Sequence, residues 1–204
     1  ITEDEEIQRV APVIEAVKAR FDVPVSIDTY KAKVAAAAIE AGADLVNDIW
    51  GLKYDPEMAG LIARTGVACC LMHNKNNTEY QDFYPDMLRE TAECVKLAKE
   101  AGIADDKIIL DPGVGFGKNY EQNLETILHM ERFHELGYPM LLGTSRKSVI
   151  GLTLDLPADQ RVEGTLVTTV MAVMKKYAFV RVHDIKENQR TIRMTEAILK
   201  AGEN

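Results

Sequence analysis

The chain has few aromatic residues, few cysteines and a shortage of positive charge. Aromatic residues make up 6% of its 204 positions, and Lys and Arg number 24 against 32 Asp and Glu, which gives a net charge of -8. An acidic surface argues against nucleic acid as a partner, because such binding needs a basic face. Two of the three cysteines, Cys69 and Cys70, lie in the apolar run VACCLM, which predicts buried thiols in a reducing cytoplasm.

Long apolar runs and standard nucleotide-binding loops are also missing. No run approaches the roughly 20 residues of a membrane span, and the acidic start ITEDEEIQRV is unlike a signal peptide, so we expect no membrane partner. The loop DPGVGFGK at 111–118 is not a phosphate loop, because that pattern needs glycine in place of Pro112 and Ser or Thr in place of Asn119. Its glycines are expected to let the backbone turn sharply or approach a ligand.

The chain does contain a regular alternation of short apolar runs and helical segments. Parallel strands buried on both faces read as continuous apolar runs. Such runs predict strands at 23–27, 45–49, 67–72, 107–110, 140–142 and 178–182. Helices are predicted at 2–20, 31–41, 55–65, 85–101, 119–136, within 159–177, and at 187–200. Strands and helices that alternate in this way form a parallel sheet.

We interpret this α/β pattern as a (β/α)8 TIM barrel. A complete barrel has eight strands and typically about 250 residues, so the first two strands and first helix are absent from this chain. We therefore predict one incomplete barrel domain over residues 1–204. We expect the natural protein to be longer by about 50–80 amino-terminal residues. We also expect these 204 residues alone to be poorly soluble or inactive, because open sheet edges promote aggregation. A six-stranded open α/β sheet is the structural alternative.

Polar residues follow each of the six apolar runs. They are Asp28, Asn47 with Asp48, His73, Asp111, the segment 144–147, and Arg181 with His183. Barrel enzymes carry their functional residues at the carboxyl ends of the strands. The sequence therefore predicts one polar site that is built from six strand ends.

Some of these strand ends carry hydrogen-bond acceptors, and others carry positively charged residues. Asp28, Asn47 and Asp111 suit a heterocycle that presents several N–H donors on one edge, since a carboxylate can accept two at once. The alternative is that Asp28 and Asn47 cap the helices that follow them. Arg181 and His183 alternate onto one face of their strand and could grip a phosphate, unless they are ordinary surface charges.

Two aromatic residues, His73 and Phe116, and the lack of a nucleophilic triad also bear on the predicted function. His73 is expected to form hydrogen bonds in a loop, since Asn74 is a poor metal ligand and no H-x-E-x-H pattern occurs. Phe116 is either an exposed aromatic in the site or a core anchor. We find no Ser-His-Asp or Cys-His arrangement, so a protein nucleophile is not expected.

Six motifs together resemble the dihydropteroate synthase family in order and spacing. They are SIDT at 26–29, NDI at 47–49, LMH at 71–73, DPGVGFGK at 111–118, GTSRKS at 143–148 and RVHD at 181–184. The resemblance implies a (β/α)8 barrel that is a transferase of folate biosynthesis and a target of sulfonamides. An enzyme of this family joins 6-hydroxymethyl-7,8-dihydropterin diphosphate to 4-aminobenzoate, giving 7,8-dihydropteroate and diphosphate.

The resemblance also implies roles for individual residues. The pterin would be held by Asp28, Asn47, Met72, Asp111, Gly143, Lys147 and Arg181. The diphosphate would be held by Arg181 and His183, and 4-aminobenzoate by Phe116, Lys147 and Ser148. Lys147, Arg181 and His183 would be catalytic. Mg²⁺ would accompany the diphosphate, but the expected Asn ligand and an Arg-bearing loop of the family are absent from this sequence, so no metal ligand is assigned here.

Two other functions stay open at this point. A methyltetrahydrofolate-binding methyltransferase of the same barrel superfamily would share the acidic residues but would not need Arg181, His183 or the TSRKS segment. A non-catalytic pterin-binding barrel is the second alternative. A homodimer is also left open.

Overall fold

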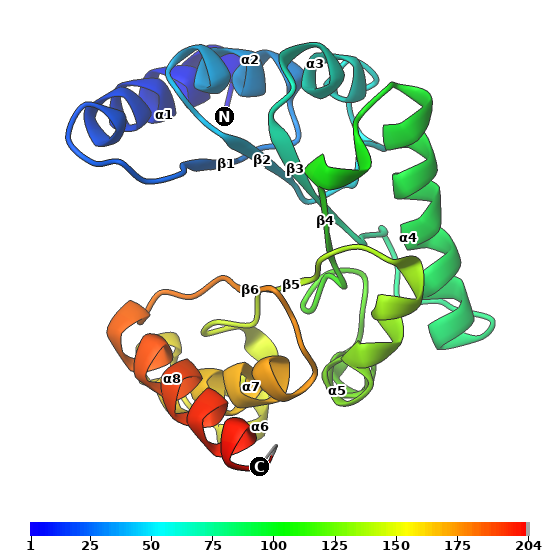
Figure 1. Ribbon diagram of the computed structural model, residues 1–204. Helices are drawn as coiled ribbons and strands as arrows, with labels where there is room; N and C mark the ends of the chain where they lie inside the picture. Colours follow the sequence, from blue (N-terminus) through cyan, green and yellow to red (C-terminus); the bar gives the residue numbers. More distant parts are fainter. Residues whose placement is uncertain (203–204) are drawn as a thin grey trace. The chain divides into compact units, whose positions relative to one another are not determined.

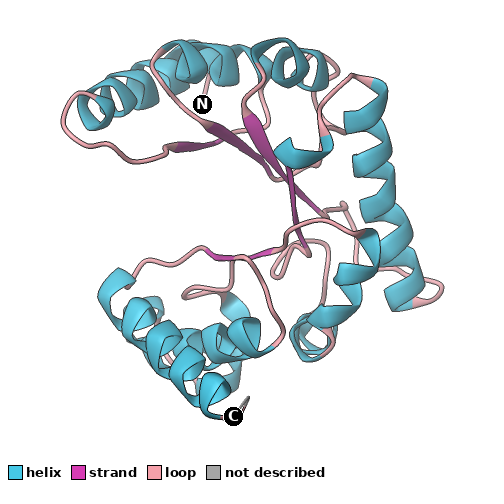
Figure 2. Cartoon of the chain, viewed as in Figure 1, coloured by secondary structure: helices cyan, strands magenta, loops and turns pink. Residues whose placement is uncertain are grey.

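The computed structural model describes residues 1–202 as eight α-helices, six β-strands and three 3₁₀ segments (Figure 1). The chain divides into two compact units, which are treated separately below. Unit 1 comprises Ile1–Asn74 and Met87–Leu110, and unit 2 comprises Lys75–Asp86 and the chain from Asp111 onward. Figure 2 shows that short strands alternate with helices along the chain, as the apolar periodicity predicts.

Unit 1 is built on one sheet with the strands in chain order. Its strands are β1 (Ser26–Asp28), β2 (Leu45–Asp48), β3 (Ala68–Met72) and β4 (Ile108–Asp111). β1 and β3 each pair in parallel with β2. The helices are α1 (Glu3–Lys18), α2 (Ala32–Glu40), α3 (Met58–Thr65) and most of α4 (Phe83–Glu100). Figure 1 shows α1, α2 and α3 along one face of this sheet.

Small and aliphatic residues bring the unit 1 helices close to the sheet. Val34, Ala35 and Ala38 of α2 are fully buried, as is Val46 of β2. At the end of β2, the buried carboxylate of Asp48 accepts hydrogen bonds from the next loop, which fixes the turn into α3. The predicted parallel pairing is confirmed for β1, β2 and β3.

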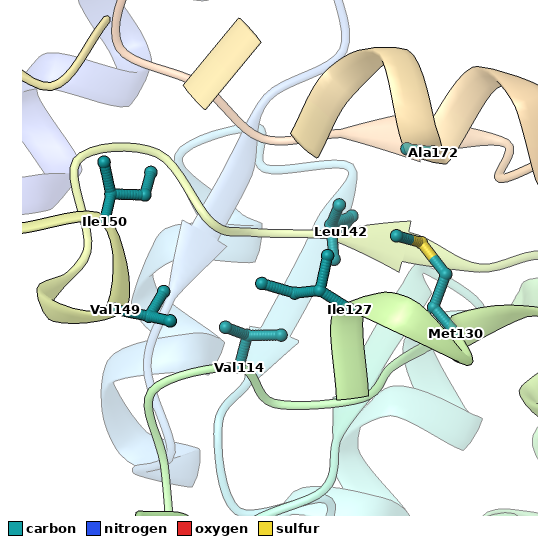
Figure 3. Close-up of a cluster of buried hydrophobic side chains, with 7 residues drawn as sticks. All are labelled: Val114, Ile127, Met130, Leu142, Val149, Ile150 and Ala172. Atoms are coloured by element: carbon teal, nitrogen blue, oxygen red, sulfur yellow. The ribbon is translucent and has the colours of Figure 1, made fainter. Parts of the chain in front are cut away.

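Unit 2 contains a two-stranded parallel sheet and four helices. Its strands are β5 (Leu141–Leu142) and β6 (Phe179–Val180). The helices are α5 (Tyr120–Leu128), α6 (Ser148–Leu154), α7 (Val162–Met174) and α8 (Ile185–Ala201). Figure 3 shows the core cluster, in which side chains meet from the loop after β4, α5, the 3₁₀ segment Met130–Leu136, β5, α6 and α7: Val114, Ile127, Met130, Leu142, Val149, Ile150 and Ala172.

Several predicted elements differ from the structure. The helix predicted at 119–136 ends at Leu128, and a 3₁₀ segment, Met130–Leu136, follows it. The helix predicted from 55 begins at Met58, because Asp55 accepts the N–H of Glu57 outside the helix. The strand predicted at 178–182 shortens to β6, and α6 was not predicted. Two further 3₁₀ segments, Asp105–Lys107 and Ala158–Gln160, precede β4 and α7.

Candidate active site

Three predicted site residues share one face of the unit 1 sheet. Asp28 of β1 is the register partner of Asn47 of β2, and Asn47 is the partner of Cys70 of β3. Met72 lies two residues beyond Cys70, and residues two apart on a strand point to the same side. Asp28 is exposed, whereas Asn47 and Met72 are buried. Unit 1 thus presents an acceptor, an amide and an apolar side chain on one face.

The capping alternative for Asp28 and Asn47 is wrong. The N-cap of α2 is Lys31, and the first N–H of that helix, from Ala32, donates to Asp55 at 2.8 Å. The N-cap of α3 is Glu57, without a side-chain cap. Neither predicted site residue therefore serves as a cap.

In unit 2, the loop at 111–118 is held by hydrogen bonds from its own residues. Asp111 ends β4, and its carboxylate accepts the N–H of Gly113 at 2.7 Å. The buried Lys118 donates from Nζ to the carbonyls of Gly113 and Phe116 at 3.0 and 3.1 Å. At Gly117, φ is +56°, and a Cβ atom would lie 2.8 Å from the carbonyl oxygen of Lys75. The glycines thus provide the sharp turns and close approach that the sequence predicts.

Sequence reasoning missed the role of Lys118. The Gly-Lys pair suggested a nucleotide loop, which the spacing excluded, and no further signal in the sequence points to this residue. The structure shows that its ammonium group satisfies two carbonyls of the loop, so Lys118 stabilises the loop conformation.

The carboxylate of Asp111 lies at the centre of a cationic environment. Burial raises the pKa of Asp111, while Lys147, the Gly113 N–H, Lys118 and Arg181 oppose this rise. Gly143 lies against the carboxylate, since a Cβ atom there would be 3.5 Å from Asp111 Oδ2. A buried carboxylate with a perturbed pKa and three cations in its environment has the character of a binding group, because such groups gather at functional sites.

Lys147 and Phe116 lie next to each other in unit 2. The Lys147 ammonium is 4.7 Å from the centroid of the Phe116 ring, within the range of a cation–π contact, and it donates to the carbonyl of Val114. Phe116 is half-buried, and the neighbouring Val114 occupies the core position. The core-anchor alternative for Phe116 is therefore wrong.

The GTSRKS and RVHD motifs are joined by two sets of contacts. Ser145 Oγ accepts the backbone N–H of His183 at 3.1 Å and lies 2.9 Å from its Nδ1. Arg146 donates from Nε and Nη2 to the carboxylate of Asp184 at 3.0 and 2.5 Å. Arg146 holds the pKa of Asp184 below its usual range. Sequence reasoning missed this pairing, because the partners are far apart in the chain.

The remaining cations of these motifs lie at the surface of unit 2. Arg181 and His183 are exposed, and Val182 between them is half-buried, which agrees with the predicted alternation. The N–H of Arg181 donates to Leu142 O at 2.9 Å and so extends the β5–β6 pairing. Ser148 is exposed at the first position of α6.

His73 belongs to the packing of unit 1. Its ring is buried, and Nε2 lies 2.8 Å from the Glu90 carboxylate of α4, so the hydrogen-bonding role is confirmed with a helix residue as the partner. Residues 1–202 contain no group of three or more His, Cys, Asp or Glu side chains that could hold a metal ion.

The three cysteines are free and buried, which confirms the buried thiols predicted for Cys69 and Cys70. Burial raises the pKa of Cys69 to about 12 and that of Cys94 to about 11. Thiols with such pKa values stay protonated and are poor nucleophiles. In the part of the chain that the structure describes, no helix is long and apolar enough to cross a membrane.

The strand-end arrangement agrees with comparisons to known proteins. Residues 1–183 match the model of a family described as pterin binding enzyme. The chain belongs to this family. It is 59% identical over 201 residues to the dihydropteroate synthase of Clostridium beijerinckii, which covers 98% of this chain and 75% of that protein. It is 50% identical over 202 residues to that of Bacillus subtilis, covering 99% and 71%.

Solved structures of dihydropteroate synthases share the fold. The chain superposes with a TM-score of 0.95 on the enzyme from Clostridium difficile in the presence of pteroic acid, at 46% identity over 97% of this chain and 76% of that one. For the Yersinia pestis enzyme with a pterin–sulfa conjugate, the TM-score is 0.94, at 40% identity over 98% and 78%. These structures confirm the predicted TIM-barrel fold class.

The relatives also decide the class of activity. Dihydropteroate synthase is a transferase of folate biosynthesis, so the predicted enzyme class is confirmed. Neither the methyltransferase nor the non-catalytic barrel is favoured by these similarities. The chain spans about three quarters of the length of the relatives that it matches.

Proposed function

We propose that this chain joins 6-hydroxymethyl-7,8-dihydropterin diphosphate to 4-aminobenzoate through the predicted strand-end residues. The observation that carries this proposal is the buried carboxylate of Asp111. Lys147 and Arg181 contribute positive charge near this carboxylate. Gly143 lies beside it and, having no side chain, does not cover it. A carboxylate in this setting can accept two N–H groups from the amino-pyrimidine edge of a pterin. Burial makes such hydrogen bonds stronger than they are in water.

Unit 1 offers acceptors of the same kind. Asp28 and Asn47 are register partners, so they offer neighbouring acceptors to N–H groups of a pterin. Met72 supplies apolar contact. Lys147 donates to an acceptor of the ring, and the planar guanidinium of Arg181 stacks on it.

Arg181 and His183 promote departure of the diphosphate. Both are exposed at alternate positions after β6, so both can donate to the same anion. Their hydrogen bonds offset the charge that the leaving oxygen gains as the C–O bond breaks. The amine of 4-aminobenzoate then forms the C–N bond at the methylene carbon and loses a proton to solvent. Phe116, Lys147 and Ser148 contact 4-aminobenzoate.

Mg²⁺ remains a proposal for this chain. The described residues provide no cluster of acidic, histidine or cysteine ligands that would hold it. Mg²⁺ keeps several waters and often binds through substrate phosphates, so the oxygens of the diphosphate would be its main ligands. No step above depends on the metal.

Inhibition by sulfonamides is a further proposal. Structures of the Yersinia pestis enzyme include a pterin–sulfa conjugate and a sulfonamide drug complex. A sulfonamide presents an aniline like that of 4-aminobenzoate, so it would use the same contacts at Phe116 and Ser148 in this chain.

The experiment that tests the proposal is calorimetry of pterin binding to Asp111→Asn. We expect binding to weaken by about 1.5–3 kcal/mol, the contribution of a hydrogen bond to a charged group. Asp48→Asn is the matched control, because burial also raises the pKa of Asp48, but both of its carboxylate oxygens already accept backbone N–H groups. Unchanged affinity in a folded Asp111→Asn protein would remove Asp111 from the pterin site.

We also propose that a second copy of the chain covers an apolar groove between α7 and α8. The groove is lined by Val170, Met174, Thr191, Met194, Thr195, Ile198 and Leu199. Met174, Met194 and Ile198 are each more than half exposed, and contiguous apolar surface of this kind marks protein–protein contacts. A two-fold dimer would bury the groove against its own copy.

A further inference from the structure

We propose that Ser145 is a positioning residue that selects the tautomer of His183. In the selected form, the imidazole is neutral, Nδ1 accepts a hydrogen bond from Ser145, and Nε2 carries the proton. His183 then presents an N–H donor to the diphosphate without first being protonated. The last step rests on the function proposed above, whereas the tautomer itself does not.

The contacts of Ser145 determine the direction of its hydrogen bond. The side chain is buried, and its Oγ has two neighbours, the backbone N–H and the Nδ1 atom of His183. The N–H can only donate, so it uses one lone pair of the hydroxyl oxygen. The hydroxyl proton is then left with one acceptor among these contacts, which is Nδ1 at 2.9 Å.

The opposite tautomer would leave a polar group without a partner. If Nδ1 carried the proton, Ser145 Oγ would accept from two N–H groups of His183, and its own proton would have no acceptor among its contacts. An unsatisfied buried donor costs free energy. Ser145 thus favours the neutral Nε2–H form.

The segment that carries Ser145 is held rigidly. Arg146 has a left-handed backbone, with φ of 59°, and its N–H donates to Thr165 Oγ1 at 3.1 Å. Arg161 donates to the carbonyl of Arg146 at 2.9 Å. Because Arg146 also binds Asp184, the two segments meet at two points, and the hydroxyl of Ser145 is directed at the ring.

The tautomer can be measured without substrate. Long-range ¹H–¹⁵N NMR of histidine-labelled protein reports which ring nitrogen carries the proton. For the neutral ring, we expect only the Nε2–H form in the parent chain, a mixture of both forms in Ser145→Ala, and recovery of the single form in Ser145→Thr. A parent chain with its proton on Nδ1, or an unchanged tautomer in Ser145→Ala, would overturn the inference.

Kinetics with the complete enzyme test the functional consequence. In Ser145→Ala, we expect KM for the pterin diphosphate to rise about 3–10-fold near pH 8, the loss of part of one hydrogen bond, with KM for 4-aminobenzoate unchanged. The defect should shrink at low pH, where a protonated ring carries donors on both nitrogens. A defect independent of pH would indicate a purely structural role and would contradict the inference.

A control variant separates the two proposals. Thr91→Ala removes a buried hydroxyl bond of α4, from Thr91 Oγ1 to Met87 O, and should change neither the tautomer nor KM. If Ser145→Ala alters the tautomer but leaves KM unchanged, the positioning role of Ser145 is supported, and the assignment of His183 to the diphosphate fails instead.

Discussion

Asp111 is a carboxylate whose burial opposes its ionisation, and this sets a pH dependence of folding. Its raised pKa means that the folded protein holds a proton at pH values where the unfolded chain has lost it. The stability from this proton is complete below the ordinary carboxyl pKa of about 3.9 and is lost as pH rises through the raised value in the folded state. The ionised carboxylate is thus less favourable to the fold than the protonated group, but it is the stronger hydrogen-bond acceptor.

We predict that Asp111→Asn removes this component of the pH dependence. The free energy of unfolding of the parent should fall more steeply above pH 4 than that of the variant, because Asn does not ionise. Urea denaturation at several pH values measures both slopes. Since Asp48 also has a raised pKa, only the difference between the two proteins reports on Asp111. Parallel slopes would contradict the burial argument.

Loss of the Arg181 side chain should weaken binding of pterin diphosphate more than binding of unphosphorylated pterin. We predict that Arg181→Ala loses about 1.5–3 kcal/mol of affinity for pterin diphosphate, the scale of charge-assisted hydrogen bonds, and less for unphosphorylated pterin. Calorimetry with both ligands provides the comparison, and Arg190→Ala on the exposed surface of α8 is a matched control. Equal losses for both ligands would restrict Arg181 to stacking on the ring.

At the scale of single residues, the sequence predicts which side chains stand at strand ends but not how they are held. Asp111 precedes a proline and three glycines, so its place in a loop could be inferred. The partners of Ser145 and Arg146 could not, because both are 38 positions away. Such contacts depend on the packing of β5 against β6, and residue spacing does not reveal it.

The elements show the same contrast between local and tertiary signals. The start of α5 follows from a local capping box between Asn119 and Gln122, which the sequence contains. Its end at Leu128 lacks a glycine or proline, so the apolar pattern through Leu136 predicted one helix. The short α6 was missed because its seven residues include Gly151 and give little helical periodicity.

The loop at 111–118 permits a test of the close contact between its backbone at Gly117 and Lys75. Gly117→Ala should destabilise the fold by more than the roughly 1 kcal/mol of left-handed strain, because its Cβ would also collide with the backbone of Lys75. Gly137→Ala is the matched control, since Gly137 also has positive φ but no atom within 4 Å of the added Cβ. Thermal or urea denaturation measures both. Equal losses would mean that the close approach relaxes without cost.

At the scale of the whole molecule, alternation of strands and helices was sufficient to predict the fold class. The division into two compact units was not visible, because the segment Lys75–Asp86 joins unit 2 although its neighbours in sequence belong to unit 1. The segment Lys75–Asp86 is held in unit 2 by contacts between residues distant in sequence, such as the hydrogen bond from the Tyr80 hydroxyl to the carbonyl of Gly117. The overall charge of -8 likewise hides a local group of cations around Asp111.

The last prediction concerns assembly through the α7–α8 groove. Met194 is 62% exposed within it, so Met194→Glu places a charge in the proposed contact while it keeps a good helix former. Burial of an unpaired charge is costly, so we expect the variant to be monomeric at concentrations where the parent is dimeric. Sedimentation equilibrium measures the change. Gln189→Glu adds the same charge on α8 outside the groove and should leave the dimer intact. A parent chain that is already monomeric, or dimers of equal strength in all three proteins, would show that a second copy does not cover this groove.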